Sequence, residues 1–355
     1  MYVMSNEVVK NKKPVWVKIV IIILSVILGL SALLVGGIAY FRLSVKDYYD
    51  NSEKAFEIPG LNKGFVPQGF CYDQNNEWFL TTGFMQNGSA SPIYIIDNAS
   101  KSTIKTLYLN DANGNAYAGH CGGIAFFNDY VYITNGTERC LYVFDYKQIK
   151  NAKNNAKINA LGTFSTKYSD SDYLAPSCVE VYGNKLIVGE FYRKNSYPTL
   201  STHHLETPNK DKNTALALEY TLYPSGYFTS TFGVNPTPQK AYSLPSQVQG
   251  LTFYKGNIFL STSWGLAFSE IKVYDNSACK TSSIKMFGTT LPLTYLDSYS
   301  LINTITAPPM SEEIVILDNF LLIMNESASN KYIFGKFTGG KYCYSTPLSK
   351  YGFYD

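Results

Sequence analysis

The pattern of apolar and polar positions divides the chain into two unlike parts. Residues 19–41, IVIIILSVILGLSALLVGGIAYF, contain no charged side chain. A helix of that length spans the hydrocarbon core of a bilayer. After residue 46 the apolar positions instead come in short runs of about five to eight residues, which predicts β-strands.

One stretch of the second part shows the pattern clearly. Residues 248–265, VQGLTFYKGNIFLSTSWG, read as an apolar run, a tight KGN turn and a second apolar run. This pattern predicts two strands joined by a short turn. Related units start near residues 68, 122, 177 and 312, and they read GFCYDQNNEWFLTTG (69–83), GGIAFFNDYVYITNG (122–136), CVEVYGNKLIVGE (178–190) and EEIVILDNFLLIMNE (312–326).

Further strands complete each unit. Third strands are predicted at 91–97, 139–145, 269–275 and 331–337, and fourth strands at 103–109, 160–166 and 283–288. Four short antiparallel strands, repeated about every 50 to 70 residues, are typical of a β-propeller. We therefore predict an all-β fold, a five-bladed β-propeller preceded by one transmembrane helix, with residues 55–60 completing the last blade. A polar insertion at 193–214 makes the third unit irregular, and a sixth blade within the stretch through Leu244 stays an alternative.

The charges around the apolar run predict its orientation. Lys10, Lys12, Lys13 and Lys18 precede the run, whereas only Arg42 and Lys46 follow it closely. Because cations favour the cytoplasmic side, we expect a single-pass signal-anchor in the cell membrane, with an extracytoplasmic C-terminal domain. The expected divisions are a cytoplasmic tail (1–18), a transmembrane helix (19–41), a stalk (42–54) and the propeller (55–355). A cleaved signal peptide, with a processing site at 37–39, is the alternative.

Composition narrows the range of functions. The net charge is only +3, and no basic patch is interleaved with aromatics, so nothing points to nucleic acid as a partner. The serine-hydrolase elbow, zinc-protease, P-loop and dinucleotide-binding signatures are absent. Six cysteines lie in the exported part, where either disulfides or buried free thiols fit. Closure of the ring would bring Cys343 toward Cys71, which makes that pair the candidate disulfide.

Alignment of the five units by their turns predicts a site at the mouth of a central channel. Gln68, Gly122, Ser177, Gln249 and Glu312 form one column, and Gly69, Gly123, Cys178, Gly250 and Glu313 form the next. The candidate catalytic acids are Glu312, Glu313 and Glu190. The candidate ligand-binding residues are Gln68, His120, Gln249, Trp264 and Glu326. Carboxylate, imidazole and amide groups that converge in this way also suit Ca²⁺ or Zn²⁺, while a channel lined by structural polar residues and water is the competing interpretation.

The unit at 248–265 resembles the blade motif of plant and bacterial glutaminyl cyclotransferases. The matching residues are Gln249, Gly250, Leu251, Phe253, Ser261 and Thr262, and Gln68-Gly69-Phe70 is similar to the start of the motif. The resemblance implies a five-bladed propeller and an acyl-transfer activity that depends on an acidic residue before Ser-Thr. That acid aligns with Leu260 or Ser261, neither of which is acidic.

Two functional hypotheses follow. The first is a membrane-anchored binding module that uses the channel face and the insertion at 193–214 to hold a peptide, glycan or protein ligand at the cell surface. The second is a propeller enzyme, a hydrolase or cyclotransferase, that uses a carboxylate and histidine site in the channel.

Overall fold

The computed structural model describes residues 14–224, 226–227, 229–337 and 340–354, and the chain divides into two compact units between Ser44 and Val45. In the first unit, α1 (Val15–Ser44) has a mean hydropathy of 3.0 over its most apolar window and buries none of its residues. The helix is long and apolar enough to cross a membrane, and a signal sequence has the same properties.

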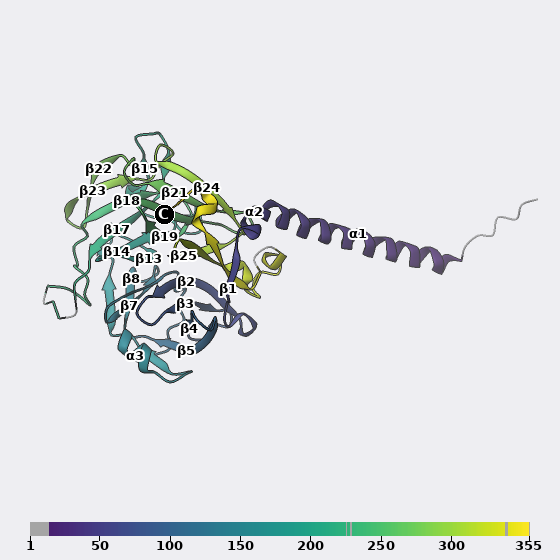
Figure 1. Ribbon diagram of the computed structural model, residues 1–355, viewed down its shortest axis with the longest axis horizontal. Coiled ribbons are helices and arrows are strands. Elements are labelled where there is room, and N and C mark those ends of the chain that lie inside the picture. The colour runs from purple at the N-terminus through teal and green to yellow at the C-terminus, as the bar shows by residue number, and fades with distance from the viewer. Residues whose placement is uncertain (1–13, 225, 228, 338–339, 355) are drawn as a thin grey trace, which may run out of the picture. The chain divides into compact units, whose positions relative to one another are not determined.

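The second unit is a five-bladed β-propeller (Figure 1). From the axis outwards, blade one is β2 (Phe65–Asp73), β3 (Trp78–Met85), β4 (Pro92–Asp97) and β5 (Ser102–Asn110). Blade two is β6 (Ile124–Phe127), β7 (Tyr130–Asn135), β8 (Cys140–Asp145) and β10 (Gly162–Ser165). Blade three is β13 (Pro176–Tyr182), β14 (Lys185–Glu190), β17 (Ala215–Thr221) and β18 (Lys240–Leu244). Blade four is β19 (Val248–Tyr254), β20 (Asn257–Thr262), β21 (Ser269–Asp275) and β24 (Leu301–Ala307). Blade five is β25 (Ser311–Leu317), β26 (Phe320–Asn325), β27 (Tyr342–Pro347) and β1 (Glu53–Glu57).

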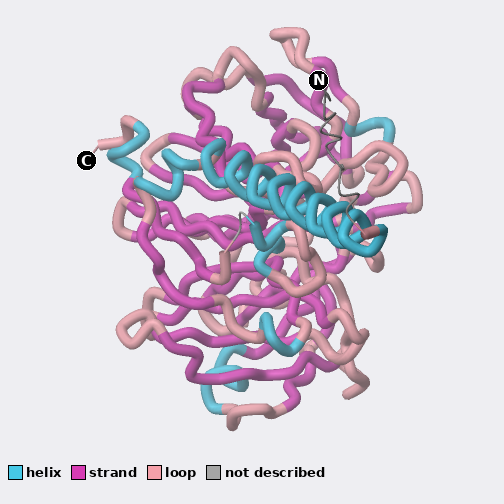
Figure 2. The backbone as a smooth tube through the Cα atoms, turned by 90° about the vertical axis from the view of Figure 1, so that its right-hand side faces the viewer, coloured by secondary structure: helices cyan, strands magenta, loops and turns pink. Residues whose placement is uncertain are grey.

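The remaining elements lie outside the four-stranded blades, mostly in the connections, and Figure 2 distinguishes helices, strands and loops by colour. The helical ones are α2 (Lys46–Asp50), α3 (Tyr146–Asn151), η1 (Leu61–Lys63), η2 (Ser201–His203), η3 (Glu326–Ala328), η4 (Gly335–Phe337) and η5 (Leu348–Tyr351). The extended ones are β9 (Lys157–Asn159), β11 (Lys167–Ser169), β12 (Asp172–Tyr173), β15 (Leu205–Glu206), β16 (Lys212–Asn213), β22 (Thr281–Met286) and β23 (Thr289–Tyr295).

The ring closes as the sequence predicted, because the N-terminal strand completes the last blade. β1 pairs antiparallel with β27, placing Glu53 opposite Ser345 and Phe56 opposite Cys343. Just before this strand, Val45 and Tyr48 are buried in a core cluster with side chains of blades four and five. The chain therefore joins the propeller core from Val45 onwards.

Two of the predicted blade strands are wrong. Residues 283–288 were expected to be the fourth strand of blade four, but β22 pairs with β23, which extends blade three by parallel pairing with β18. β24 takes the fourth position instead. Residues 331–337 were expected to be the third strand of blade five, but this stretch is a loop containing η4, and β27 takes that place. In both cases a short apolar run flanked by polar residues has the pattern of a strand. Whether such a run forms a strand, and in which blade, depends on the strands with which it can pair.

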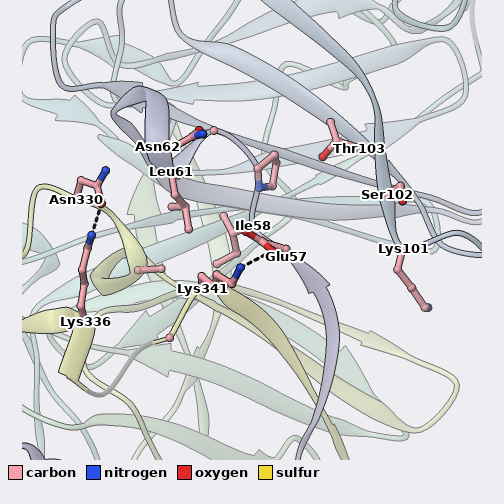
Figure 3. A pocket seen from close by; sticks show the side chains of 14 residues that line it. Glu57, Ile58, Leu61, Asn62, Lys101, Ser102, Thr103, Asn330, Lys336 and Lys341 are labelled. Atoms are coloured by element: carbon pink, nitrogen blue, oxygen red, sulfur yellow. Dashed lines mark hydrogen bonds and ion pairs between the residues drawn. The ribbon is translucent and has the colours of Figure 1, made fainter.

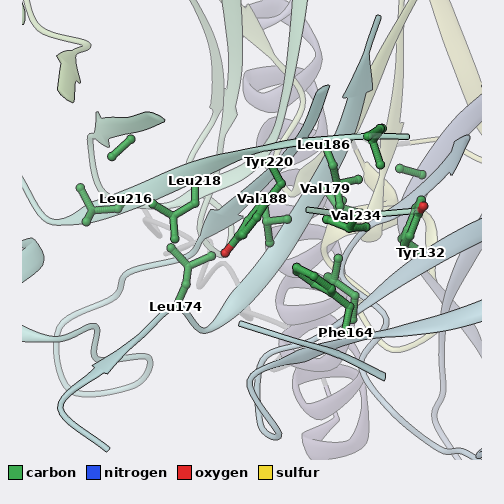
Figure 4. Close-up of a cluster of buried hydrophobic side chains, with 14 of the residues drawn as sticks. Tyr132, Phe164, Leu174, Val179, Leu186, Val188, Leu216, Leu218, Tyr220 and Val234 are labelled. Carbon is green, nitrogen blue, oxygen red and sulfur yellow. The ribbon is translucent and has the colours of Figure 1, made fainter. Parts of the chain in front are cut away.

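Hydrophobic packing between adjacent blades supplies the core. The largest cluster joins blades two and three, and Figure 4 shows Phe164, Leu174 and Tyr220 meeting across that seam. The six cysteines all lie in the described part of the chain and are unpaired. The Cys71–Cys343 disulfide is therefore a wrong prediction: Cys343 packs in the seam of blades five and one, and Cys71 in that of blades one and two.

Candidate functional site

Small residues let the innermost strands converge at the axis. A Cβ atom added to Gly250 would stand 2.6 Å from the Cα atom of Glu313, and one added to Gly123 would stand 2.7 Å from the Val179 nitrogen. No real side chain tolerates contacts that short, so the glycines of this column are required by packing. The pairing register also shifts at this level in β2, β13, β19 and β25, which is a β-bulge repeated around the ring.

Glu313 has the largest side chain of the same column, and its carboxyl group lies where the innermost strands of several blades meet. We call this position the axial seal. Its Oε2 accepts hydrogen bonds from the backbone N–H groups of Phe70 (2.8 Å) and Ile124 (3.0 Å), and its Oε1 accepts one from Val179 (3.1 Å). A carboxylate from blade five thereby binds blades one, two and three. Burial raises the pKa of Glu313 well above its usual range, and the three N–H donors oppose that rise.

A pocket of about 520 Å³, which we call the axial pocket, lies at the channel mouth, and all five blades contribute to its lining. Five of the side chains predicted for the site line it together. They are Gln68, His120, Gln249, Trp264 and Glu326. Glu312 lies against this lining, because its Oε1 is 3.3 Å from Nε2 of Gln249. Alignment of the repeats thus selected residues of four blades that lie close together in the folded chain.

Two neighbouring carboxyl groups mark one side of the pocket. Glu312 is 1% exposed, and burial together with the nearby Glu326 carboxylate raises its pKa well above the usual range. Burial also raises the pKa of Glu326, although the hydroxyl of Tyr332, which donates at 2.7 Å, and the Lys331 ammonium oppose the rise. Burial and a second acid nearby both disfavour ionisation, so this pair holds a proton more readily than ordinary carboxyl groups do. Such a pair can donate or accept a proton, or bind a polar group of a ligand.

An aromatic wall faces the opening from blades three and four. Trp264 lies 6.0 Å from both Phe191 and Tyr197 between ring centroids, and the Arg193 guanidinium is 4.9 Å from the Trp264 ring. Phe191, Arg193 and Tyr197 belong to the irregular connection that follows β14. Sequence reasoning selected Trp264 but missed its three neighbours, because no repeat aligns an insertion; the only signal was the aromatic and basic content of FYRKNSY.

His120 belongs to a second stack on the pocket lining. Its ring lies 5.0 Å from that of Phe84 at an angle of 22°, and Nζ of Lys331 stands 4.5 Å from the same Phe84 ring. Part of the residue is open to solvent, yet desolvation of the imidazole by surrounding protein, together with the Lys331 charge, lowers the pKa of His120 to about 4. The imidazole is therefore neutral at pH 7, and it is available as a hydrogen-bonding and stacking group.

None of the three predicted catalytic acids is among the residues that line the pocket, and only Glu312 lies against that lining. Glu313 lies at the axial seal, and Glu190 is fully buried at the end of β14, where it accepts hydrogen bonds from His203 and from two backbone N–H groups. A further acid that the sequence did not single out, Glu180, lies on the other side of the seal. Burial raises the pKa of Glu180 to about 8, and a hydrogen bond from Thr252 (2.8 Å) limits the rise.

A second hollow, of about 760 Å³, lies between the start of β5, the segment after β1 and the loop after β26. Figure 3 shows Lys101, Lys336 and Lys341 around it, with Lys341 paired to Glu57 at 2.8 Å. The lysines and the polar groups of this hollow are largely exposed. It therefore lacks the buried carboxyl groups and the aromatic wall of the axial pocket.

Among the described residues, no three His, Cys, Asp or Glu side chains form a group able to hold a metal ion. The expected Ca²⁺ or Zn²⁺ site thus gains no support from a donor cluster. The acids of the pocket are accompanied instead by amide, phenol and ammonium groups.

Comparison with known proteins finds distant structural likenesses. No family model matches the chain, and no curated protein matches it. A glutaminyl cyclase from Myxococcus xanthus aligns with 12% identity and a TM-score of 0.42, over 83% of this chain and 94% of the other. A putative oxidoreductase (glucose dehydrogenase) from Thermus thermophilus gives 11% identity and a TM-score of 0.41, over 83% and 98% of the two chains. BamB from Moraxella catarrhalis gives 9% identity and a TM-score of 0.34, over 79% and 84%. The likeness to a glutaminyl cyclase is distant, and these values are too low to indicate a family or an activity.

Proposed function

We propose that the propeller is a ligand-binding module of the cell surface, which takes up a peptide or glycan in the axial pocket. The observation that carries this proposal is the convergence of all five blades on one cavity of about 520 Å³. A concave site with aromatic walls and a few converging polar groups is typical of ligand pockets. The apolar helix α1 supports a membrane-anchored protein, with the propeller outside the cytoplasm.

The lining matches the chemistry of such ligands. Gln68 and Gln249 supply amide donors and acceptors, and Glu326 supplies a carboxyl group. Trp264 and Tyr197 offer broad apolar faces next to these polar groups. Peptides and glycans both combine polar edges with apolar faces, so both classes fit.

Emission from Trp264 provides the test. The chain contains Trp16, Trp78 and Trp264, so replacement of the first two by Phe leaves one reporter in the pocket wall. We expect a member of a panel of short peptides and oligosaccharides to shift its emission and to raise the midpoint of thermal unfolding. Gln249→Ala should weaken that ligand about tenfold, whereas Asn257→Ala, in the outward turn of the same blade, should not. If no peptide and no oligosaccharide of the panel changes the Trp264 emission or the unfolding midpoint, the proposal is wrong.

The acid pair favours a second function, that of a propeller hydrolase or acyltransferase. In this case Glu312 or Glu326 would act as general acid or base beside Gln68 and Gln249. Glu312→Gln and Glu326→Gln discriminate the two functions. Turnover of a bound ligand that falls at least 100-fold in these variants, with binding retained, supports the enzyme, and absence of turnover in the native chain excludes it for that ligand.

A further inference from the structure

The connection between β14 and β17 forms a wall of the pocket but has little regular structure. It covers residues 191–214, and its secondary structure is limited to the short elements η2, β15 and β16. Phe191, Ser196, Tyr197 and Pro198 of this connection line the pocket. A loop of this length needs specific anchors if it is to hold a defined shape.

One anchor is a buried contact between a carboxylate and an imidazole. Glu190 is 0% exposed and His203 is 1% exposed, and His203 Nδ1 lies 2.7 Å from Glu190 Oε2. With Nδ1 protonated, the imidazole donates to the carboxylate. A buried polar contact of this kind is expensive to break, because the His203 imidazole would then lack its partner away from water.

The same carboxylate also connects two parts of the pocket. Its Oε1 accepts from the backbone N–H of Ala175 at 3.2 Å, and its Oε2 accepts from that of Leu216, also at 3.2 Å. Ala175 is followed by Pro176 and Ser177, and all three line the pocket. Glu190 thus joins the entry of β13, the start of β17 and the 191–214 connection at one point.

We propose that Glu190 and His203 are positioning residues that hold the 191–214 connection against Trp264 and so determine which ligands the axial pocket accepts. The selectivity half of this proposal rests on the proposed binding function, whereas the anchoring half does not. Loss of the anchor would let Phe191, Arg193 and Tyr197 leave the Trp264 ring.

The neighbouring histidine provides a matched control. His204 is exposed, and its Nε2 lies 3.0 Å from the Thr199 hydroxyl. His203→Ala removes the buried donor to Glu190, while His204→Ala removes an exposed ring whose contacts, with Tyr192 and Thr199, stay within the connection itself. His203→Asn is the rescue variant, because its amide NH₂ can take the place of the imidazole Nδ1–H.

The experiment uses the full chain with Trp264 as its single tryptophan, and it needs no ligand. We expect His203→Ala to increase quenching of Trp264 by acrylamide at least twofold. Trypsin cleavage after Arg193, Lys194, Lys210 or Lys212 should accelerate at least tenfold. His204→Ala should change neither quantity, and His203→Asn should restore most of both. A folded His203→Ala variant with native quenching and cleavage would overturn the anchor; should that variant fail to fold, Glu190→Gln serves for the same two measurements.

A ligand found by the Trp264 screen then tests selectivity. His203→Ala should weaken the best ligand about tenfold and narrow the difference between it and its near analogues. Equal weakening of every ligand would overturn the selectivity half and leave the anchor intact. A screen without any ligand would overturn the binding function alone, since quenching and cleavage report the anchor independently.

Discussion

Glu312 and Glu313 are consecutive residues of β25, yet their carboxyl groups lie in regions of opposite character. Glu313 occupies the axial seal, where three backbone N–H groups from three other blades surround it. Glu312 lies at the pocket, beside another acid and the amide of Gln249. At the seal three fixed donors satisfy the buried Glu313 carboxyl group, whereas in the pocket two acids lie together. Burial raises the pKa of both Glu312 and Glu313, but only Glu312 lies beside a second acid at the pocket.

Removal of the axial carboxylate should have the largest effect. Glu313→Leu leaves the N–H groups of Phe70, Ile124 and Val179 buried without their acceptor. At about 1–3 kcal/mol for each unsatisfied group, we expect a loss of roughly 4–6 kcal/mol in the free energy of unfolding, measured by urea denaturation. Glu313→Gln keeps one acceptor oxygen and should lose less. Equal stability of all three chains would show that the seal does not stabilise the ring.

A methyl group added at the axis should lower the free energy of unfolding somewhat less than the loss of the Glu313 carboxyl group. In Gly250→Ala the new Cβ atom meets the Glu313 backbone at 2.6 Å, so the strands must move apart. Overpacking of a rigid core costs about 1–3 kcal/mol, and we expect the upper end. Gly256→Ala is the control in the same hairpin: its site is open, and its φ of +78° costs only about 1 kcal/mol. A smaller loss in Gly250→Ala than in Gly256→Ala would contradict the close approach at the axis.

We expect the acid pair of the pocket, Glu312 and Glu326, to change how the free energy of unfolding depends on pH. The pKa of Glu312 is raised in the folded chain, from an ordinary value of 4.5. Below pH 4.5 the group is protonated in both states, so it contributes no difference. As the pH rises above 4.5, the unfolded chain gains from ionisation while the folded one keeps the proton, and folding weakens.

Glu312→Gln removes this penalty. Relative to the native chain, the variant should lose less unfolding free energy as the pH rises from 5 to 7, by at most about 1.4 kcal/mol for each pH unit, measured by urea denaturation at each pH. Glu53→Gln, which removes an exposed carboxyl group outside the pocket, is the matched control. A parallel pH profile for native and Glu312→Gln chains would rule out the raised pKa.

Much of the architecture could be predicted from repetition alone. The five hairpins, their shared axis and the closing strand all follow from alternation and from the spacing of one motif. The strands at 283–288 and 331–337 were misplaced, because an apolar run carries no record of the strand with which it pairs. Pocket residues that belong to the repeat, such as Gln68 and Gln249, were found in the same way as the blades. Tyr197 and Arg193 were not, because they lie in an insertion that has no counterpart in the other blades.

The apolar N-terminal helix, the fivefold β pattern and the column of small residues that ends in Glu313 can all be predicted from the order of the residues. These are local or periodic properties, and side-chain chemistry and spacing suffice to state them. The roles of the acids depend instead on how the chain folds. Whether a carboxyl group meets backbone N–H groups, as at Glu313, a histidine, as at Glu190, or another acid, as at Glu312, depends on segments more than ten residues away. At Glu312 and Glu313 burial raises the pKa, by an amount that those neighbours modify.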